Sequence, residues 1–188
     1  GVRVAAGVCL LVLDVKAAAL PLIYWRPAPY ATAPAPVAAL FAIMTKGGAY
    51  SFIRFYPVAC PPDLEVTQGL LDTWLLPGAL LTLAIGMIGV LGAKRLDRLV
   101  AFAVVGSMGM LLTSVSVFTP EGIAAALFYA VHSTLATAAL FLLVDVIRSR
   151  RAEGNLGWTP APPTVGGALV AAIFFAAAIP MAGFPPPP

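Results

Sequence analysis

Long apolar segments alternate with short polar connections along the chain. Each apolar segment holds about 20 residues, the length that a helix needs to cross the hydrocarbon core of a bilayer. No segment alternates between apolar and polar residues at every second position, as a barrel strand would. The pattern predicts an all-α integral membrane protein in which residues 1–188 form a single transmembrane region of about six helices, at approximately 2–25, 37–56, 73–93, 99–118, 121–147 and 164–184.

The polar connections fall into two sets that differ in charge. Successive connections lie on opposite sides of the membrane, and one set carries seven basic residues: Arg26, Lys94, Arg95, Arg98, Arg148, Arg150 and Arg151. The other set carries mainly acidic residues, with arginines only near helix ends. Because Lys and Arg are enriched in cytoplasmic loops, we expect the seven basic residues to face the cytoplasm.

Composition excludes several classes of function. Only 10% of the residues are charged and 61% are hydrophobic, whereas a soluble domain carries roughly 25% charged residues. The net charge of +3 is too small for a nucleic-acid interface. Two isolated cysteines, Cys9 and Cys60, and a single histidine do not provide the spacing of a metal site. No nucleophile–base set or phosphate loop indicates an enzyme or a cofactor.

Three ionisable residues lie near the middle of apolar spans. Lys46 is nine residues after Val37 and ten before Tyr56, so it lies roughly 14 to 15 Å from either end of its helix. Lys16 and His132 lie at similar depths in the first and fifth spans. An ionisable group inside a membrane indicates function by default, and burial disfavours the charged form of Lys and His, which helps them exchange protons. We predict a proton relay through Lys16, Lys46 and His132, directed along the plane of the membrane.

Prolines and small residues interrupt the spans. Pro21 and Pro180 each remove a helical hydrogen bond, which bares a backbone carbonyl for an ion site or is an ordinary kink of a membrane helix. Gly106, Ser107 and Gly109 in the fourth span predict close packing against another helix.

The polar residues beside the relay have two interpretations each. Ser133 and Thr134 either hold water next to the histidine or satisfy its hydrogen bonds as a structural residue. Asp14 lies two residues from the first lysine and does not share its helix face, so it pairs with another helix or with a charge outside this chain. For Asp145, a local surface pair with Arg148 is the simpler interpretation.

The segments around the two lysines resemble a family of antiporter-like membrane subunits. The resemblance rests on VKAAALPLIYWRPAPY and on APAPVAALFAIMTKGGAYSFIRFY. These subunits occur in the multi-subunit Mrp-type Na+/H+ antiporters and in the proton-pumping NADH–quinone oxidoreductases. The later run EGIAAALFYAVHSTLATAALFLLVDVI is most similar to the MrpD-like branch of the Mrp antiporters.

The resemblance implies a fold of about fourteen transmembrane helices with two inverted repeats, each holding a broken helix. The six spans then correspond to helices seven to twelve, with Lys16 on the seventh, Lys46 on the eighth and His132 on the eleventh, in a hydrated axis that relays protons. The glutamate of the family's fifth helix would precede Gly1. The final Pro187–Pro188 departs from the usual continuation of the twelfth helix. We therefore expect this chain to be a fragment of a larger subunit.

We expect that larger subunit to be a secondary transporter rather than an enzyme. It would exchange a monovalent cation, with Na+ favoured, for protons across the bacterial inner membrane, together with other subunits in the lipid bilayer. An NADH-linked pump that drives the same row of residues by redox chemistry is the first alternative. A non-conducting membrane scaffold is the second, because the chain holds neither repeat complete.

Overall fold

The computed structural model describes residues 33–59, 75–117, 119–151, 156–157 and 166–181, together with Val4, Gly7, Val8 and Val12. Five helices follow one another in this part of the chain: α3 (Ala35–Ala59), α4 (Leu75–Gly92), α5 (Leu96–Ser116), α6 (Pro120–Arg150) and α7 (Gly167–Met181). Four segments of them, Pro36–Phe55, Leu75–Gly92, Leu96–Ser116 and Pro120–Arg150, are long and apolar enough to cross a membrane, and α7 is a shorter apolar helix. The all-α membrane class is confirmed, whereas the expected span 2–25 lies outside the described residues except for four positions.

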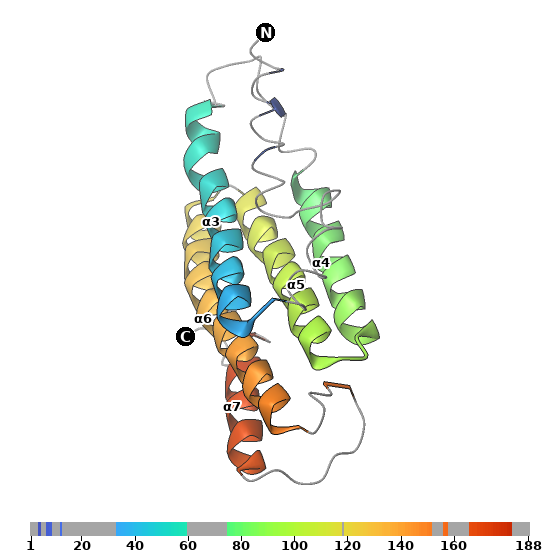
Figure 1. The fold of residues 1–188 in the computed structure, drawn as a ribbon. Helices are drawn as coiled ribbons and strands as arrows, with labels where there is room; N and C mark the ends of the chain where they lie inside the picture. Colours follow the sequence, from blue (N-terminus) through green and yellow to red (C-terminus); the bar gives the residue numbers. More distant parts are fainter. Residues whose placement is uncertain are drawn as a thin grey trace.

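The helices form an antiparallel bundle around α5. Figure 1 shows α3 and α5 running in one direction and α4 and α6 in the other. α4 packs mainly on α5, α6 contacts both α3 and α5, and α7 packs on α6. Of the four candidate spans, α5 has the largest buried share, 61%, against 22% for α4. The described part of the bundle therefore leaves large apolar surfaces on its outer helices.

Three helices extend further into the polar connections than the sequence predicted, and one of them is α3, which covers Ala35–Ala59 rather than 37–56. α5 begins at Leu96 rather than Leu99, with Asp97 in its first turn, and α6 continues to Arg150. Negative charge at a helix start and positive charge at a helix end are favourable with respect to the helix dipole, so these charged residues do not end the helices. The predicted start of α6 agrees with the structure, where Thr119 caps the helix by accepting a hydrogen bond from the Gly122 backbone N–H and Pro120 follows it.

Glycines bring α4 and α5 into close backbone contact. A Cβ atom added to Gly86 of α4 would collide with the backbone of Gly106 on α5, and one added to Gly109 would collide with the backbone of Leu83. Close approach of this kind gives van der Waals contact where lipid removes most of the hydrophobic driving force. The packing role predicted for Gly106 and Gly109 is therefore confirmed.

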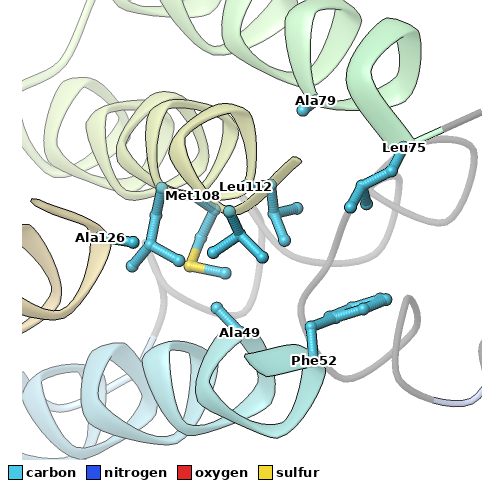
Figure 2. Close-up of a cluster of buried hydrophobic side chains, with 9 residues drawn as sticks. Ala49, Phe52, Leu75, Ala79, Met108, Leu112 and Ala126 are labelled. Atoms are coloured by element: carbon cyan, nitrogen blue, oxygen red, sulfur yellow. The ribbon is translucent and has the colours of Figure 1, made fainter. Parts of the chain in front are cut away.

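A cluster of apolar side chains joins four helices. Figure 2 shows Met108 of α5 pointing toward Ala49 and Phe52 of α3, with Ala79 of α4 on the other side of α5. Other members of the cluster come from α4, α5 and α6: Leu75, Leu111, Leu112, Val115 and Ala126. The members are at most 6% exposed. This packing fixes α3, α5 and α6 relative to one another beside the candidate site.

An acidic residue ties the basic end of the bundle together. The Asp97 carboxylate accepts hydrogen bonds from Arg95 Nη2 at 2.8 Å and Arg95 Nε at 3.1 Å, and it lies 3.6 Å from Arg148 Nη2 at the end of α6. Hydrogen bonding to Asp97, and then its negative charge, raise the pKa of the Arg95 guanidinium. The Leu96 backbone N–H donates a hydrogen bond of 3.0 Å to the Leu156 carbonyl, which connects the segment after α6 to the start of α5. Asp97 thus links the start of α5 to the end of α6, and its neighbour Leu96 links α5 to the segment after α6.

This arrangement corrects the interpretation of Asp145. Arg148 forms its ion pair with Asp97 rather than with the carboxylate three residues before it. Asp145 is exposed, whereas Asp97 is 3% exposed. A carboxylate in a less hydrated position gains more from an arginine, and sequence spacing alone does not reveal the partner on another helix.

Alanine substitution of the interface glycines tests the close contact between α4 and α5. We expect Gly86→Ala and Gly109→Ala each to destabilise the protein by roughly 1–3 kcal/mol, because the added methyl group meets backbone atoms. Gly78→Ala is the matched control, since nothing lies within 4 Å of its added Cβ, and a helical Gly→Ala change gains up to about 1 kcal/mol. Thermal melting of the purified protein in detergent measures all three. Equal melting temperatures for Gly86→Ala and Gly78→Ala would contradict the contact.

Replacement of Asp97 by Asn tests the charge cluster. We expect Asp97→Asn to lower stability by about 1–2 kcal/mol, since hydrogen bonds to charged groups contribute roughly 1.5–3 kcal/mol and the two arginines are partly screened by solvent. Asp145→Asn removes an exposed carboxylate near the end of α6, at the same end of the bundle, and we expect the stability to change by no more than about 0.5 kcal/mol. Denaturation of both variants under one set of conditions makes the comparison. A similar loss in both variants would show that Asp97 has no special role.

Candidate functional site

Lys46 lies in the interior of the bundle. It is ten residues from Pro36 and nine from Phe55 in its membrane-spanning segment, which is roughly 14 to 15 Å from each end. Its side chain is directed inward, and the residue is 5% exposed. The predicted position near mid-membrane therefore agrees with the geometry of α3.

The amino group of Lys46 contacts two other helices. Lys46 Nζ donates a hydrogen bond of 2.6 Å to Ser107 Oγ on α5. Ser107 in turn donates to the backbone carbonyl of Val104 at 2.7 Å. Lys46 Nζ also lies 5.8 Å from the centroid of the Tyr129 ring on α6. The Lys46 amino group, on α3, is thus positioned by a hydroxyl group of α5 and by the face of an aromatic ring of α6.

These contacts stabilise an ammonium group without neutralising it. A serine hydroxyl that donates elsewhere keeps an oxygen lone pair for the lysine, and the face of an aromatic ring attracts a cation within about 6 Å. In the described ranges, the ion pairs found involve Asp97, and none involves Lys46. A proton on Lys46 is therefore held by dipoles and by a ring quadrupole, a weaker compensation than a carboxylate provides in an apolar interior.

His132 lies on α6 apart from the Lys46 contacts. Its ring is half-buried and stacks on Phe128, with centroids 6.4 Å apart and planes 9° apart. Phe128 is 77% exposed, so the stacked pair reaches the outer surface of the described bundle. Tyr129, three residues before His132, lies against Lys46, whereas the lysine and the histidine form no direct contact within the described bundle.

The hydroxyls next to His132 bond to their own helix. Ser133 and Thr134 both donate to the Ala130 carbonyl, at 3.4 and 2.6 Å. The buried Thr137 donates to the carbonyl of Ser133 at 2.6 Å. Each hydroxyl oxygen keeps its lone pairs for a further donor, so both interpretations of Ser133 and Thr134 stay predictions.

The remaining predicted residues lie at or beyond the edge of the described chain. Lys16, Asp14 and Pro21 fall outside the described residues. Pro180 is the penultimate residue of α7, which ends at Met181. Its lack of an N–H group removes the hydrogen bond that residue 180 would give to the carbonyl of Ala176.

Sequence reasoning missed the two partners of Lys46. Ser107 was interpreted only as a small packing residue. Tyr129 lies in an apolar helix, where nothing in the sequence indicated a contact with Lys46. The depth of Ser107 was a usable signal, because it lies eleven residues after Leu96 and nine before Ser116 and so matches the depth of Lys46. Gly106 and Gly109 face α4 in the same turn, while Ser107 is directed to α3.

Comparison with known proteins identifies the family. The sequence pattern that defines the family "NADH:quinone oxidoreductase/Mrp antiporter, TM" matches residues 2–186. The chain is 40% identical over 140 residues to a probable K(+)/H(+) antiporter subunit of Rhizobium meliloti (strain 1021), an alignment that covers 74% of this chain and 26% of the relative. It is 33% identical over 182 residues to a Na(+)/H(+) antiporter subunit of Bacillus subtilis (strain 168), covering 94% of this chain and 35% of the relative.

Solved structures share the arrangement of the helices. A chain in the Mrp complex of Dietzia sp. DQ12-45-1b superposes with a TM-score of 0.79 at 31% identity, covering 97% of this chain and 33% of that chain. A chain of an archaeal respiratory complex, the membrane-bound sulfane sulfur reductase, superposes with a TM-score of 0.77 at 22% identity, covering 92% of this chain and 35% of that chain. The second likeness shows the fold alone.

The chain spans about a quarter to a third of the length of these relatives. Its apolar helices and its bacterial relatives mark it as a multi-pass protein of the inner membrane. The match over residues 2–186 extends across nearly the whole sequence. The chain therefore belongs to the NADH:quinone oxidoreductase/Mrp antiporter family of transmembrane subunits, with MrpD-like subunits of the cation/proton antiporters among its relatives.

Proposed function

We propose that this chain is part of a membrane subunit of a multi-subunit monovalent cation/proton antiporter, and that Lys46 passes protons within it. One observation carries the proposal: a buried amino group at mid-membrane depth is bonded to a hydroxyl on another helix. Ionisable residues at such depth are rare and mark ion and proton pathways. The names of two relatives, which describe K+/H+ and Na+/H+ antiporter subunits, support the same function.

The Lys46 contacts provide two states that differ by one proton. In the charged state the ammonium group donates to Ser107, while the hydroxyl proton of Ser107 is directed to Val104. In the neutral state the amine nitrogen has a lone pair and can accept the hydroxyl proton when the serine rotates. Ser107 therefore accommodates both states with a rotation about one bond, and the lysine does not need to leave its position.

Exchange with a cation follows from electrostatics in an apolar interior. Two positive charges a few ångströms apart repel much more strongly there than in water. A monovalent cation that enters near Lys46 therefore favours release of its proton, and a proton that returns favours departure of the cation. Because the ammonium group of Lys46 has no carboxylate partner in the described ranges, this repulsion is not cancelled locally.

The proposed path continues on both sides of Lys46. In this proposal Lys16 comes before Lys46 along the path, and His132 on α6 comes after it. Because no direct contact joins Lys46 to His132 in the described helices, protons cross between them through water. The other subunits of the complex and the lipid bilayer are the partners that this assignment requires.

The cation is proposed to be Na+, with K+ as the direct competitor. The names of the two relatives differ on this point. Lys46, Ser107 and Tyr129 form a proton site rather than a cation cage, so they do not select between the two ions. Transport measured with each cation in turn decides this part of the proposal.

A proton-pumping subunit of an NADH-linked oxidoreductase is the second candidate. It is favoured by the family, whose description includes both kinds of complex. The same lysine would serve in both, because a redox-driven change of a nearby charge shifts its proton as a cation does. Cation-dependent proton movement in vesicles that lack NADH distinguishes the antiporter from the pump.

Replacement of Lys46 in the full-length protein tests the relay. With its partner subunits present, we expect Lys46→Gln to lower cation/proton exchange by roughly tenfold or more, since positioned proton-transfer groups contribute factors of this size or larger. Arg54→Gln removes an exposed positive charge from the same helix, and we expect exchange to remain near the wild-type rate. Everted membrane vesicles with a pH-sensitive dye provide the measurement. Unchanged exchange in Lys46→Gln would refute the relay.

Replacement of Ser107 tests the role of its hydroxyl group. We expect Ser107→Ala to lower exchange less than Lys46→Gln does, because the lysine remains but loses a hydrogen bond that contributes about 1–3 kcal/mol. Ser116→Ala is the matched control on α5, since that hydroxyl bonds only to Thr113 O of its own helix among the bonds described. The same vesicle assay, with melting temperatures measured in parallel, separates transport from stability. If both serine variants behave alike, the assigned role of Ser107 is wrong.

A further inference from the structure

A groove of about 280 Å³ lies between the end of α6 and the first two turns of α7. Figure 1 shows α7 alongside the C-terminal half of α6, at the end of the bundle where the α4–α5 connection also lies. The groove is open on one side, and Phe175, which is 60% exposed, forms part of its wall. Other apolar lining residues come from three helices: Leu96, Ile147, Val170 and Phe174.

Two arginines contribute the polar part of this groove. Arg150 and Arg151 are the last residue of α6 and its C-cap, and both line the groove. Arg151 is held in place by a hydrogen bond of 2.9 Å from its Nη1 to the Gly157 carbonyl. None of the nine described residues that line the groove is acidic. The site therefore combines fixed positive charge with an apolar wall.

The position of the groove matches the surface of the bilayer. Arg150 and Arg151 belong to the basic end of the bundle, which the positive-inside rule assigns to the cytoplasm. Phe174 and Phe175 lie about two turns further into α7, on the side of the hydrocarbon. The charges thus lie at headgroup level and the aromatic residues at acyl-chain level.

We propose that this groove binds an anionic phospholipid of the cytoplasmic leaflet, with the phosphodiester at Arg150 and Arg151 and an acyl chain leaving past Phe175. Guanidinium groups pair well with phosphate oxygens, and basic pockets between transmembrane helices are suited to acidic lipid headgroups. A zwitterionic headgroup fits less well, because its ammonium group finds no carboxylate among the described lining residues.

The size of the groove suits a small group. Its volume of about 280 Å³ is close to the lower limit, roughly 300 Å³, of sites that hold small molecules. A lipid headgroup with the first part of its chains fits this space and leaves the rest of the lipid in the bilayer.

Lipid binding to the intact complex tests the site, with the full-length protein in mild detergent. Native mass spectrometry is recorded while phosphatidylglycerol or phosphatidylethanolamine with identical chains is added. We expect the wild type to prefer phosphatidylglycerol, and Arg150→Gln to weaken that binding about fivefold, which corresponds to the roughly 1 kcal/mol that one basic residue contributes to attraction by acidic lipid. Lys94→Gln is the matched control, an exposed basic residue at the same end that does not line the groove; its binding should not change.

A second variant blocks the groove without changing its charge. Ala171 is exposed and lines the groove, so Ala171→Trp fills the space while both arginines remain. We expect it to weaken phosphatidylglycerol binding as Arg150→Gln does. Equal binding of the two lipids by the wild type overturns the proposal. It is also overturned if Lys94→Gln weakens binding as much as Arg150→Gln, or if Ala171→Trp leaves binding unchanged.

Discussion

A buried amino group at the centre of the bundle depends on one hydroxyl from another helix. Lys46 is on α3, and the oxygen that accepts its hydrogen bond is on α5. An apolar interior supplies no water to replace a missing partner, so α3 and α5 must keep their relative depth within about an ångström. The glycine contacts that fix α5 against α4 and the apolar cluster that fixes it against α3 and α6 both serve this requirement.

The sequence was sufficient for the class of protein and for the depth of its charged residues. Apolar segment length gave the membrane helices because the thickness of the bilayer dictates it, and the count from Val37 to Tyr56 placed Lys46 near the centre of α3. The glycines of α5 were correctly assigned to close packing, because a missing side chain has few other uses inside an apolar helix. These are local properties, and each can be read from one segment alone.

The partners of those residues could not be predicted in the same way. Ser107 and Tyr129 reach Lys46 only because three helices have particular rotations about their axes, and an almost uniformly apolar helix carries little periodic signal for its rotation. The same limit explains the error over Arg148. The sequence suggested Asp145, three residues away, as its partner, whereas the ion pair in the structure is with Asp97 on another helix. Proton sites on His132 and Lys16 stay predictions, because the described ring contact of His132 is with Phe128 and Lys16 lies outside the described residues.

The shared carboxylate of Asp97 has a consequence for the order of events during synthesis. Arg95, two residues away, emerges from the ribosome almost together with Asp97, whereas Arg148 follows about fifty residues later. Arg95 is therefore available to Asp97 as soon as the connection between α4 and α5 has been made. Docking of α6 then adds the second arginine, so this corner of the molecule closes only when the last basic residues of that helix arrive.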